Sequence, residues 1–341
     1  MPPLELPVLW FWLVGALLTG YAVLDGFDLG VGALHLFTKT DQERRLLLNA
    51  IGPVWDGNEV WLVTSGGALF AAFPMVYATV FSGFYLPLML VLAALIFRAV
   101  AIEFRSKQPM RWWRRLWDVS FCASSVLCSL LIGVALGNIA RGVPLDAERE
   151  FAGTFLGLLH PYALLVGVTT VALFMMHGAI YLVVKTEGRL REKVRWWVHR
   201  TMIAFIICYA TTTMATLLYV PHMGDHFKAH PILFVVPLLN MLAIANIPRE
   251  IYRGRDFRAF LSSCAAIAAL LLLFGIGIFP NIVRSAPNPE HSLTLFNAAS
   301  SPKTLATMLV IAGCGLPLVL AYTASIYWIF RGKVKLDATS Y

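Results

Sequence analysis

The chain has 341 residues, of which 59% are apolar and only 13% are Asp, Glu, Lys or Arg. Soluble domains contain about 45–50% apolar and about 25% charged residues, so the composition and the mean hydropathy of +0.72 exclude a soluble globular chain and a disordered one. The net charge of +8 would suit a nucleic-acid partner, unless the basic residues lie beside a membrane.

Runs of apolar residues follow one another along the chain. A transmembrane helix needs about 20 mostly apolar residues, and about nine such runs occur, at roughly 8–37, 54–74, 77–102, 119–140, 157–184, 196–220, 231–247, 259–282 and 304–330. The first run is too long for one straight span, so we expect it to be tilted or partly buried in protein. Pro74 predicts a turn or kink between the second and third runs. We expect an all-α polytopic membrane helix bundle of about nine transmembrane helices, forming a single domain over residues 1–341.

Basic residues gather in alternate connections between these runs. The connections 38–53, 103–118, 185–200 and 248–258, together with the C-terminal tail, hold 21 of the 27 Lys and Arg residues, and the opposite loops hold five. The positive-inside rule therefore predicts that the N-terminus lies outside and that the C-terminus is cytoplasmic. These basic residues would face anionic lipid headgroups, so no nucleic-acid partner is expected.

Cysteine and histidine show no strong pattern of a cofactor site. The five cysteines lie inside apolar runs and form no CxxC pair, which favours packing residues over disulfides or zinc. His222, His226 and His230 recur every four residues in a predicted external loop, where metal binding is a weak alternative. His177 is expected to be a packing histidine with satisfied hydrogen bonds. No paired His or Glu-x-x-His box for a haem or a metal ion is visible.

Small residues predict close helix contacts. Gly26 with Gly30, and Gly133 with Gly137, form GxxxG patterns, and Gly66-Gly67 adds a further point of close approach. Packing within the chain is the preferred interpretation over a partner interface.

Ionisable residues inside apolar runs are costly and are therefore candidate functional residues. They form three groups: Asp25 with Asp28, Asp56 with Glu59, and Arg98 with Glu103. The i, i+3 spacing of each acid pair places both carboxylates on one helix face. At 1.5 Å per residue, Asp25 lies about 26 Å from the outer start of the first run, and the other groups lie at a similar depth. Acids at staggered depths that open to the cytoplasm predict a proton entry path.

Other interpretations stay open. For Arg98, Glu59 and Glu103, an ion cluster that only fixes helix packing is preferred over proton conduction, and the order is reversed for Asp25, Asp28 and Asp56. A proton-coupled secondary transporter is the main alternative function. It is disfavoured because the acids crowd into the first 105 residues, whereas transporters usually repeat such features in both halves. A purely structural membrane scaffold is a third alternative.

Several motifs lie between residues 20 and 107. They are LDGFDLGVG at 24–32, WDGNEVW at 55–61, GGALFAAFP at 66–74, SGFY at 82–85, and FR at 97–98 through EFRSK at 103–107. Together they resemble subunit II of cytochrome bd-type quinol oxidases, including the cyanide-insensitive branch. The rest of the chain is similar in length, span number and loop pattern, and YTA at 322–324 and the basic tail also match.

The resemblance implies an activity and a set of cofactors. The complex would be an electrogenic terminal oxidase of the respiratory chain in a bacterial cytoplasmic (inner) membrane. It would oxidise ubiquinol or menaquinol and reduce oxygen to water with protons from the cytoplasm. Haem b and haem d, or a further haem b in place of haem d, would lie in a homologous subunit I.

This chain would then hold no haem, no metal ion and no catalytic residue. It would stabilise subunit I and would contribute Asp25, Asp28 and Asp56 to a proton path. The resemblance also leaves room for a structural quinone in this chain and for a small single-span accessory subunit.

Overall fold

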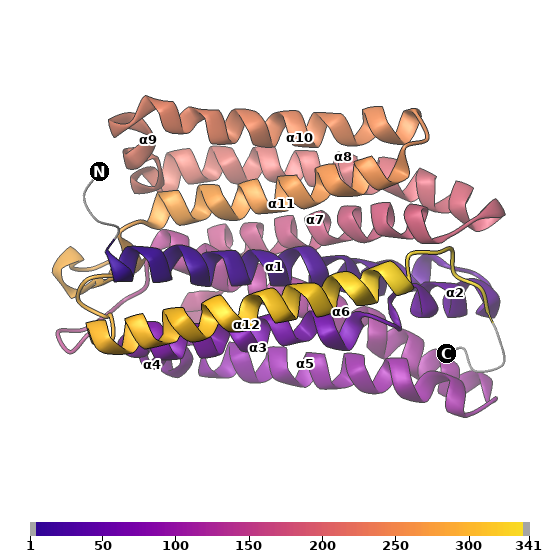
Figure 1. The fold of residues 1–341 in the computed structure, drawn as a ribbon, viewed down its shortest axis with the longest axis horizontal. Helices are drawn as coiled ribbons and strands as arrows, with labels where there is room; N and C mark the ends of the chain where they lie inside the picture. Colours follow the sequence, from indigo (N-terminus) through magenta and orange to yellow (C-terminus); the bar gives the residue numbers. More distant parts are fainter. Residues whose placement is uncertain (1–4, 337–341) are drawn as a thin grey trace.

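The computed structural model describes residues 5–336 as a bundle of helices (Figure 1). In chain order the elements are α1 (Leu6–Leu34), α2 (Asp41–Ile51), α3 (Trp55–Ala72), α4 (Pro74–Gly83), α5 (Tyr85–Phe104), α6 (Arg111–Arg141), α7 (Pro161–Lys185), α8 (Gly188–Tyr219), α9 (Asp225–Ala229), α10 (Val235–Tyr252), α11 (Asp256–Ile278), β1 (Asn281–Val283), β2 (Leu293–Thr294) and α12 (Pro302–Ile329). The two strands pair antiparallel.

The all-α membrane fold is confirmed. Among the described residues, eight helices are long and apolar enough to cross a membrane: α1, α5, α6, α7, α8, α10, α11 and α12. The 18-residue α3 lies alongside them and carries Asp56 and Glu59, which lower its hydropathy. With α3 included, the prediction of about nine spans is close.

The third predicted span, 77–102, is wrong as a single helix. It falls on α4 and α5, which are separated at Phe84, where the backbone leaves helical geometry at φ −98° and ψ 20°. The predicted turn before Pro74 is present. Phe73 is non-helical there, and Pro74 opens α4 at a position where a missing N–H costs nothing.

The basic connections are more helical than predicted. α6 begins at Arg111 and α8 begins at Gly188, so much of 103–118 and of 185–200 extends the membrane helices. Arg, Lys, Leu and Trp are all tolerated in helices, and residues 111–118 and 188–200 contain no proline to interrupt one. The connection 38–53 contains α2, whose N-cap Thr40 accepts a hydrogen bond from the Glu43 N–H.

The two ends of the bundle differ. One end, here called the basic end, carries α2 and the α5–α6, α7–α8 and α10–α11 connections (right in Figure 1). The other end, the loop end, carries α9, the two strands and the connection 142–160. All the connections that the sequence groups as basic lie at the basic end.

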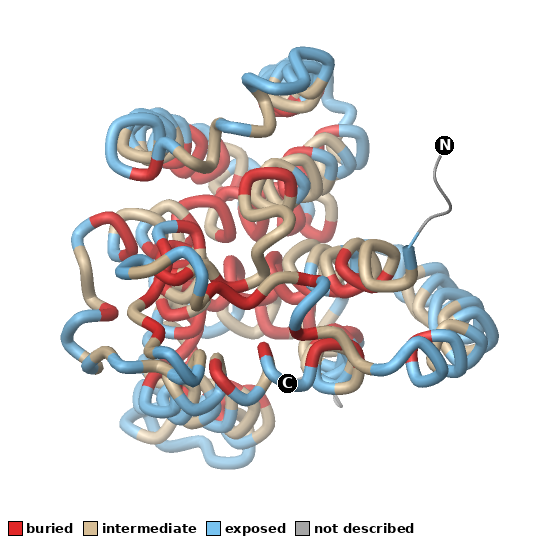
Figure 2. The backbone as a smooth tube through the Cα atoms, turned by 90° about the vertical axis from the view of Figure 1, so that its left-hand side faces the viewer, coloured by how far each residue is buried: buried red, intermediate tan, exposed pale blue. Residues whose placement is uncertain are grey.

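The core is centred on α1. Its second half is buried without a break from Asp25 to Leu34, and in Figure 2 the buried residues gather toward the middle of the molecule. Close packing depends on glycine: a Cβ on Gly30 would lie 1.8 Å from the Phe174 carbonyl oxygen of α7. The predicted partial burial of the first apolar run is therefore confirmed.

The other glycine patterns divide. Gly133 and Gly137 of α6 approach the α7 backbone at Gly167 and Ala163, so the second GxxxG packs within the chain as predicted. Gly66-Gly67 is different, because a Cβ there would meet no atom of the described chain within 4 Å. The close approach predicted at that pair is wrong for this chain alone, since this face of α3 is open.

Candidate functional site

A buried ion cluster joins three of the predicted residues. Arg98 of α5 donates to both carboxylate oxygens of Asp25 in α1, at 2.6 and 3.2 Å, and to Glu59 Oε1 of α3, at 2.7 Å. The side chains of Asp25 and Arg98 are fully buried, and that of Glu59 is 22% exposed. A charge at this depth persists only when it is paired and hydrogen-bonded, which explains why the three helices bring these groups together.

Asp28 lies one turn further along α1 and has different partners. Its Oδ2 accepts a hydrogen bond at 2.7 Å from the Asn58 side-chain amide, which also donates to the Leu24 carbonyl at 3.2 Å. The hydroxyl of Tyr327, in α12, donates to Asn58 Oδ1 at 2.9 Å. The other oxygen of Asp28, Oδ1, is buried and has no hydrogen-bond partner in the described structure.

The remaining two predicted residues lie nearer the basic end. Asp56 is in the first turn of α3 and is exposed. Glu103 is half-buried near the end of α5, five residues beyond Arg98. The predicted grouping of Arg98 with Glu103 therefore needs correction, because the guanidinium turns toward α1 and α3, where Asp25 and Glu59 accept its hydrogen bonds.

A second buried cluster was not predicted. Asp118 of α6 is fully buried and accepts hydrogen bonds from His35 Nε2 at 2.6 Å, Arg44 Nη1 at 2.7 Å and Arg105 Nε at 2.5 Å. Asp41 extends this Asp118 cluster by binding Arg105 at 2.8 Å. One signal could have revealed it, since Asp118 is the sole acid between Glu103 and Asp146 in a strongly basic stretch.

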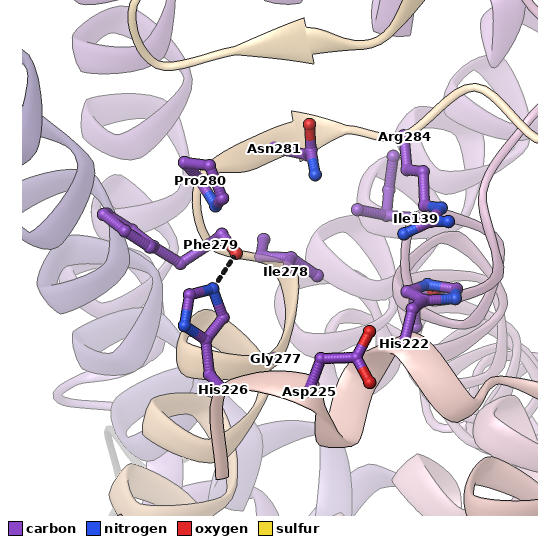
Figure 3. A pocket seen from close by; sticks show the side chains of 11 residues that line it. Ile139, His222, Asp225, His226, Gly277, Ile278, Phe279, Pro280, Asn281 and Arg284 are labelled. Carbon is purple, nitrogen blue, oxygen red and sulfur yellow. Dashed lines mark hydrogen bonds between the residues drawn. The ribbon is translucent and has the colours of Figure 1, made fainter. Parts of the chain in front are cut away.

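At the loop end there is a cavity of about 190 Å³ (Figure 3). It is lined by the ends of α6 and α11 and by α9. His222 and His226 each direct Nε2 to a backbone carbonyl, of Ala140 at 2.9 Å and of Phe279 at 2.6 Å. Burial and the nearby Arg284 lower the pKa of His222, although its bond to Ala140 opposes that shift. Because a carbonyl oxygen can only accept, Nε2 is the donor in the bond to Ala140.

His177 has the satisfied hydrogen bonds expected of a packing histidine. His177 is fully buried, with Nδ1 2.8 Å from Ser263 Oγ and Nε2 2.9 Å from the Val23 carbonyl. All five cysteines are free thiols. Within residues 5–336, no group of three or more His, Cys, Asp or Glu side chains is arranged to hold a metal ion.

Comparison with known proteins gives one consistent result. Residues 6–330 match the family described as cytochrome bd terminal oxidase subunit II. The chain is 37% identical to cytochrome bd-I ubiquinol oxidase subunit 2 of Escherichia coli (strain K12), over 96% of this chain and 95% of that one. It is 34% identical to cytochrome bd ubiquinol oxidase subunit 2 of Bacillus subtilis (strain 168), over 96% of both chains.

The fold also has a counterpart among solved structures. A chain in the structure of bd oxidase from Geobacillus thermodenitrificans superposes with a TM-score of 0.78, covering 96% of this chain and 98% of that one, at 18% identity. With its apolar helices, the protein is a multi-pass protein of the bacterial inner membrane. Sequence motifs, helix arrangement and full-length similarity to terminal oxidase subunits lead to one conclusion: the chain belongs to the cytochrome bd terminal oxidase subunit II family.

Proposed function

We propose that this chain is the haem-free subunit of a bd-type quinol:oxygen oxidoreductase. It supports a haem-bearing subunit I and supplies part of the path by which protons from the cytoplasm reach the site of oxygen reduction. The path begins at the basic end, which we assign to the cytoplasm. Its residues are Asp25, Asp28, Asp56, Glu59, Arg98 and Glu103.

The observation that carries the proposal is an imbalance of charge. Arg98 is the cation hydrogen-bonded to Asp25 and Glu59, and Asp28 lies beside them with only an amide donor. One guanidinium cannot neutralise three carboxylates in a medium of low dielectric constant, so the cluster must hold at least one proton. Such a cluster binds a proton inside the protein. Its member Glu59 lies three residues along α3 from the exposed Asp56. This arrangement suits proton transfer better than packing alone.

The partner follows from the surface of α3 and α12. An exposed carboxylate at Asp56 is costly against lipid, and further along the same helix the Gly66-Gly67 pair is open. α12 is also open, since only 6% of its most apolar 18-residue segment is buried against the rest of the chain. We assign subunit I to this side, where it would cover Asp56.

The fully buried His177 offers no free nitrogen to a haem iron, because its Nδ1 and Nε2 are both in hydrogen-bond contact, with Ser263 and with the Val23 carbonyl. Our proposal assigns the haems, and the oxidation of quinol, to subunit I.

Substitution of the acids in the purified two-subunit complex tests the proton path. Asp25→Asn and Asp56→Asn should each lower quinol-driven oxygen consumption at least tenfold while haem content stays normal, because an amide cannot carry the proton. Asp225→Asn, whose carboxylate is exposed at the loop end, is the matched control and should be silent. Normal turnover with normal haem in the first two variants would refute the path. Loss of haem would show a packing role instead.

A further inference from the structure

The geometry points to Asn58 and Tyr327 as positioning residues for Asp28. They form a relay of hydrogen bonds from α12 that fixes which oxygen of the Asp28 carboxyl is free to take a proton. This inference rests on the proposed proton path, but it concerns two residues outside that path, neither of which is ionised at neutral pH.

Both polar atoms of the Asn58 side chain take part in hydrogen bonds. Its amide nitrogen donates both protons, to Asp28 Oδ2 at 2.7 Å and to the Leu24 carbonyl at 3.2 Å, and its oxygen accepts from Tyr327 at 2.9 Å. The carboxamide is buried, with 2% of the residue exposed. Because the Tyr327 hydroxyl donates to the amide oxygen, it favours the orientation in which the NH₂ group faces Asp28.

The Asp28 carboxyl is thereby made asymmetric. Oδ2 receives the amide donor, and Oδ1 is buried without a partner. A proton on Asp28 therefore belongs on Oδ1, where it can be passed to a water molecule or a neighbouring group. If the amide turned over, its oxygen would face Asp28 and would accept a hydrogen bond from the protonated carboxyl, which would hold the proton on that carboxyl.

Tyr327 is well placed to control this because the basic end of α12, where it lies, is anchored to α7. Beyond Tyr327, Lys185 Nζ binds the Phe330 carbonyl, and the Val334 N–H donates to the Lys185 carbonyl at 2.9 Å. Lys333 Nζ donates to the Val184 carbonyl at 2.7 Å. These bonds tie the end of α12 to the end of α7 and hold the Tyr327 ring over Asn58.

The test uses the purified complex and an infrared signature of the acid. The carboxyl C=O band that disappears in Asp28→Asn identifies Asp28 in a redox-induced difference spectrum. Tyr327→Phe should shift that band and lower oxygen consumption about 3- to 10-fold, the effect of losing one hydrogen bond of typical net strength, with haem content unchanged. Asn58→Leu should do the same. The double variant should be no worse than Asn58→Leu alone, because Tyr327 acts through Asn58.

Tyr252→Phe is the control, since the Tyr252 side chain is exposed at the end of α10, away from α3 and α12, and it should change neither readout. An unchanged band and turnover in Tyr327→Phe, with Asp28→Asn impaired, would overturn the inference and leave the proton path intact. Normal turnover in Asp28→Asn would overturn both. Additive losses in the double variant, or loss of haem in Tyr327→Phe, would also overturn the inference by assigning Tyr327 to packing.

Discussion

Arg98 and Asp118 each sit at the centre of a buried cluster, with opposite balances of charge. Around Arg98, carboxylates outnumber the cation, so the cluster needs a proton to approach neutrality. Around Asp118, one carboxylate receives two guanidinium groups and an imidazole. The first arrangement can bind and release a proton. The second is already saturated with donors, so it suits a fixed joint between α1, α2, α5 and α6.

Asp118→Asn tests the joint. The change leaves Arg105 buried beside an uncharged group, and removing one partner from a buried ion pair typically costs about 3–5 kcal/mol. We expect the variant complex to unfold at a clearly lower temperature, measured by the loss of haem absorbance on heating, while the surviving protein keeps normal turnover per haem. Asp225→Asn removes an exposed carboxylate and should leave the melting temperature unchanged. A stable Asp118→Asn complex would contradict the assignment.

At the scale of helices, α1 organises the molecule because a glycine stands where α7 crosses it, so the two helices can pack closely. Gly30 and Gly178 let the backbones of α1 and α7 touch, and the adjoining turns of α1 place Asp25 beside Arg98 of α5 and Asp28 beside Asn58 of α3. Without this approach the acids would move away from their partners. The site thus depends on a contact that contains no polar side chain.

Gly30→Ala should break that contact. The new Cβ would lie 1.8 Å from the Phe174 carbonyl oxygen, a backbone atom that cannot move aside cheaply, and overpacked cores lose about 1–3 kcal/mol or more. We expect low yields of assembled complex, measured as haem per milligram of membrane protein. Gly15→Ala is the control on the same helix, because its Cβ would meet nothing within 4 Å. Equal yields from the two variants would be inconsistent with the crossing.

For the whole molecule, the asymmetry between the ends would determine which way the proposed proton path opens. The basic end holds the first turn of α3 and the last turn of α5, so Asp56 and Glu103 both lie there. The loop end instead holds the strands, α9 and the cavity beside His222. If the basic end faces the cytoplasm, protons enter from that side and turnover contributes to the membrane potential.

Labelling of single introduced cysteines measures this orientation. Arg189→Cys lies at the basic end and Ala286→Cys at the loop end, and both positions are exposed. We expect a membrane-impermeant maleimide to label Ala286→Cys in intact spheroplasts and Arg189→Cys only after permeabilisation. The parent protein, whose five thiols lie within helices, provides the background. The reverse pattern would place the proton entrance on the outer side.

How far the sequence could predict this molecule differs between its parts. Apolar runs and charge alternation predict the helices, and charged residues in those runs predict Asp25, Glu59 and Arg98, because burial of charge is costly wherever it occurs. Asn58 and Tyr327 carry no such signal, since neutral polar residues are common in membrane helices. Their role depends on how α3 and α12 meet, which no local pattern encodes. The sequence does not indicate the burial of Asp118, because its basic surroundings resemble a loop, although α6 continues through them.

The wide separation in sequence between the paired residues has a consequence for biosynthesis. Asp25 precedes its partner Arg98 by 73 residues, and Tyr327 follows Asn58 by 269. At about 5–20 residues per second, α1 must wait about 4–15 seconds for Arg98 to be translated. During that interval its two acids have no cation on α5, so α1 enters the membrane with them protonated or stays beside the insertion machinery until α5 arrives. α12, the last helix made, then completes the contacts of Asn58.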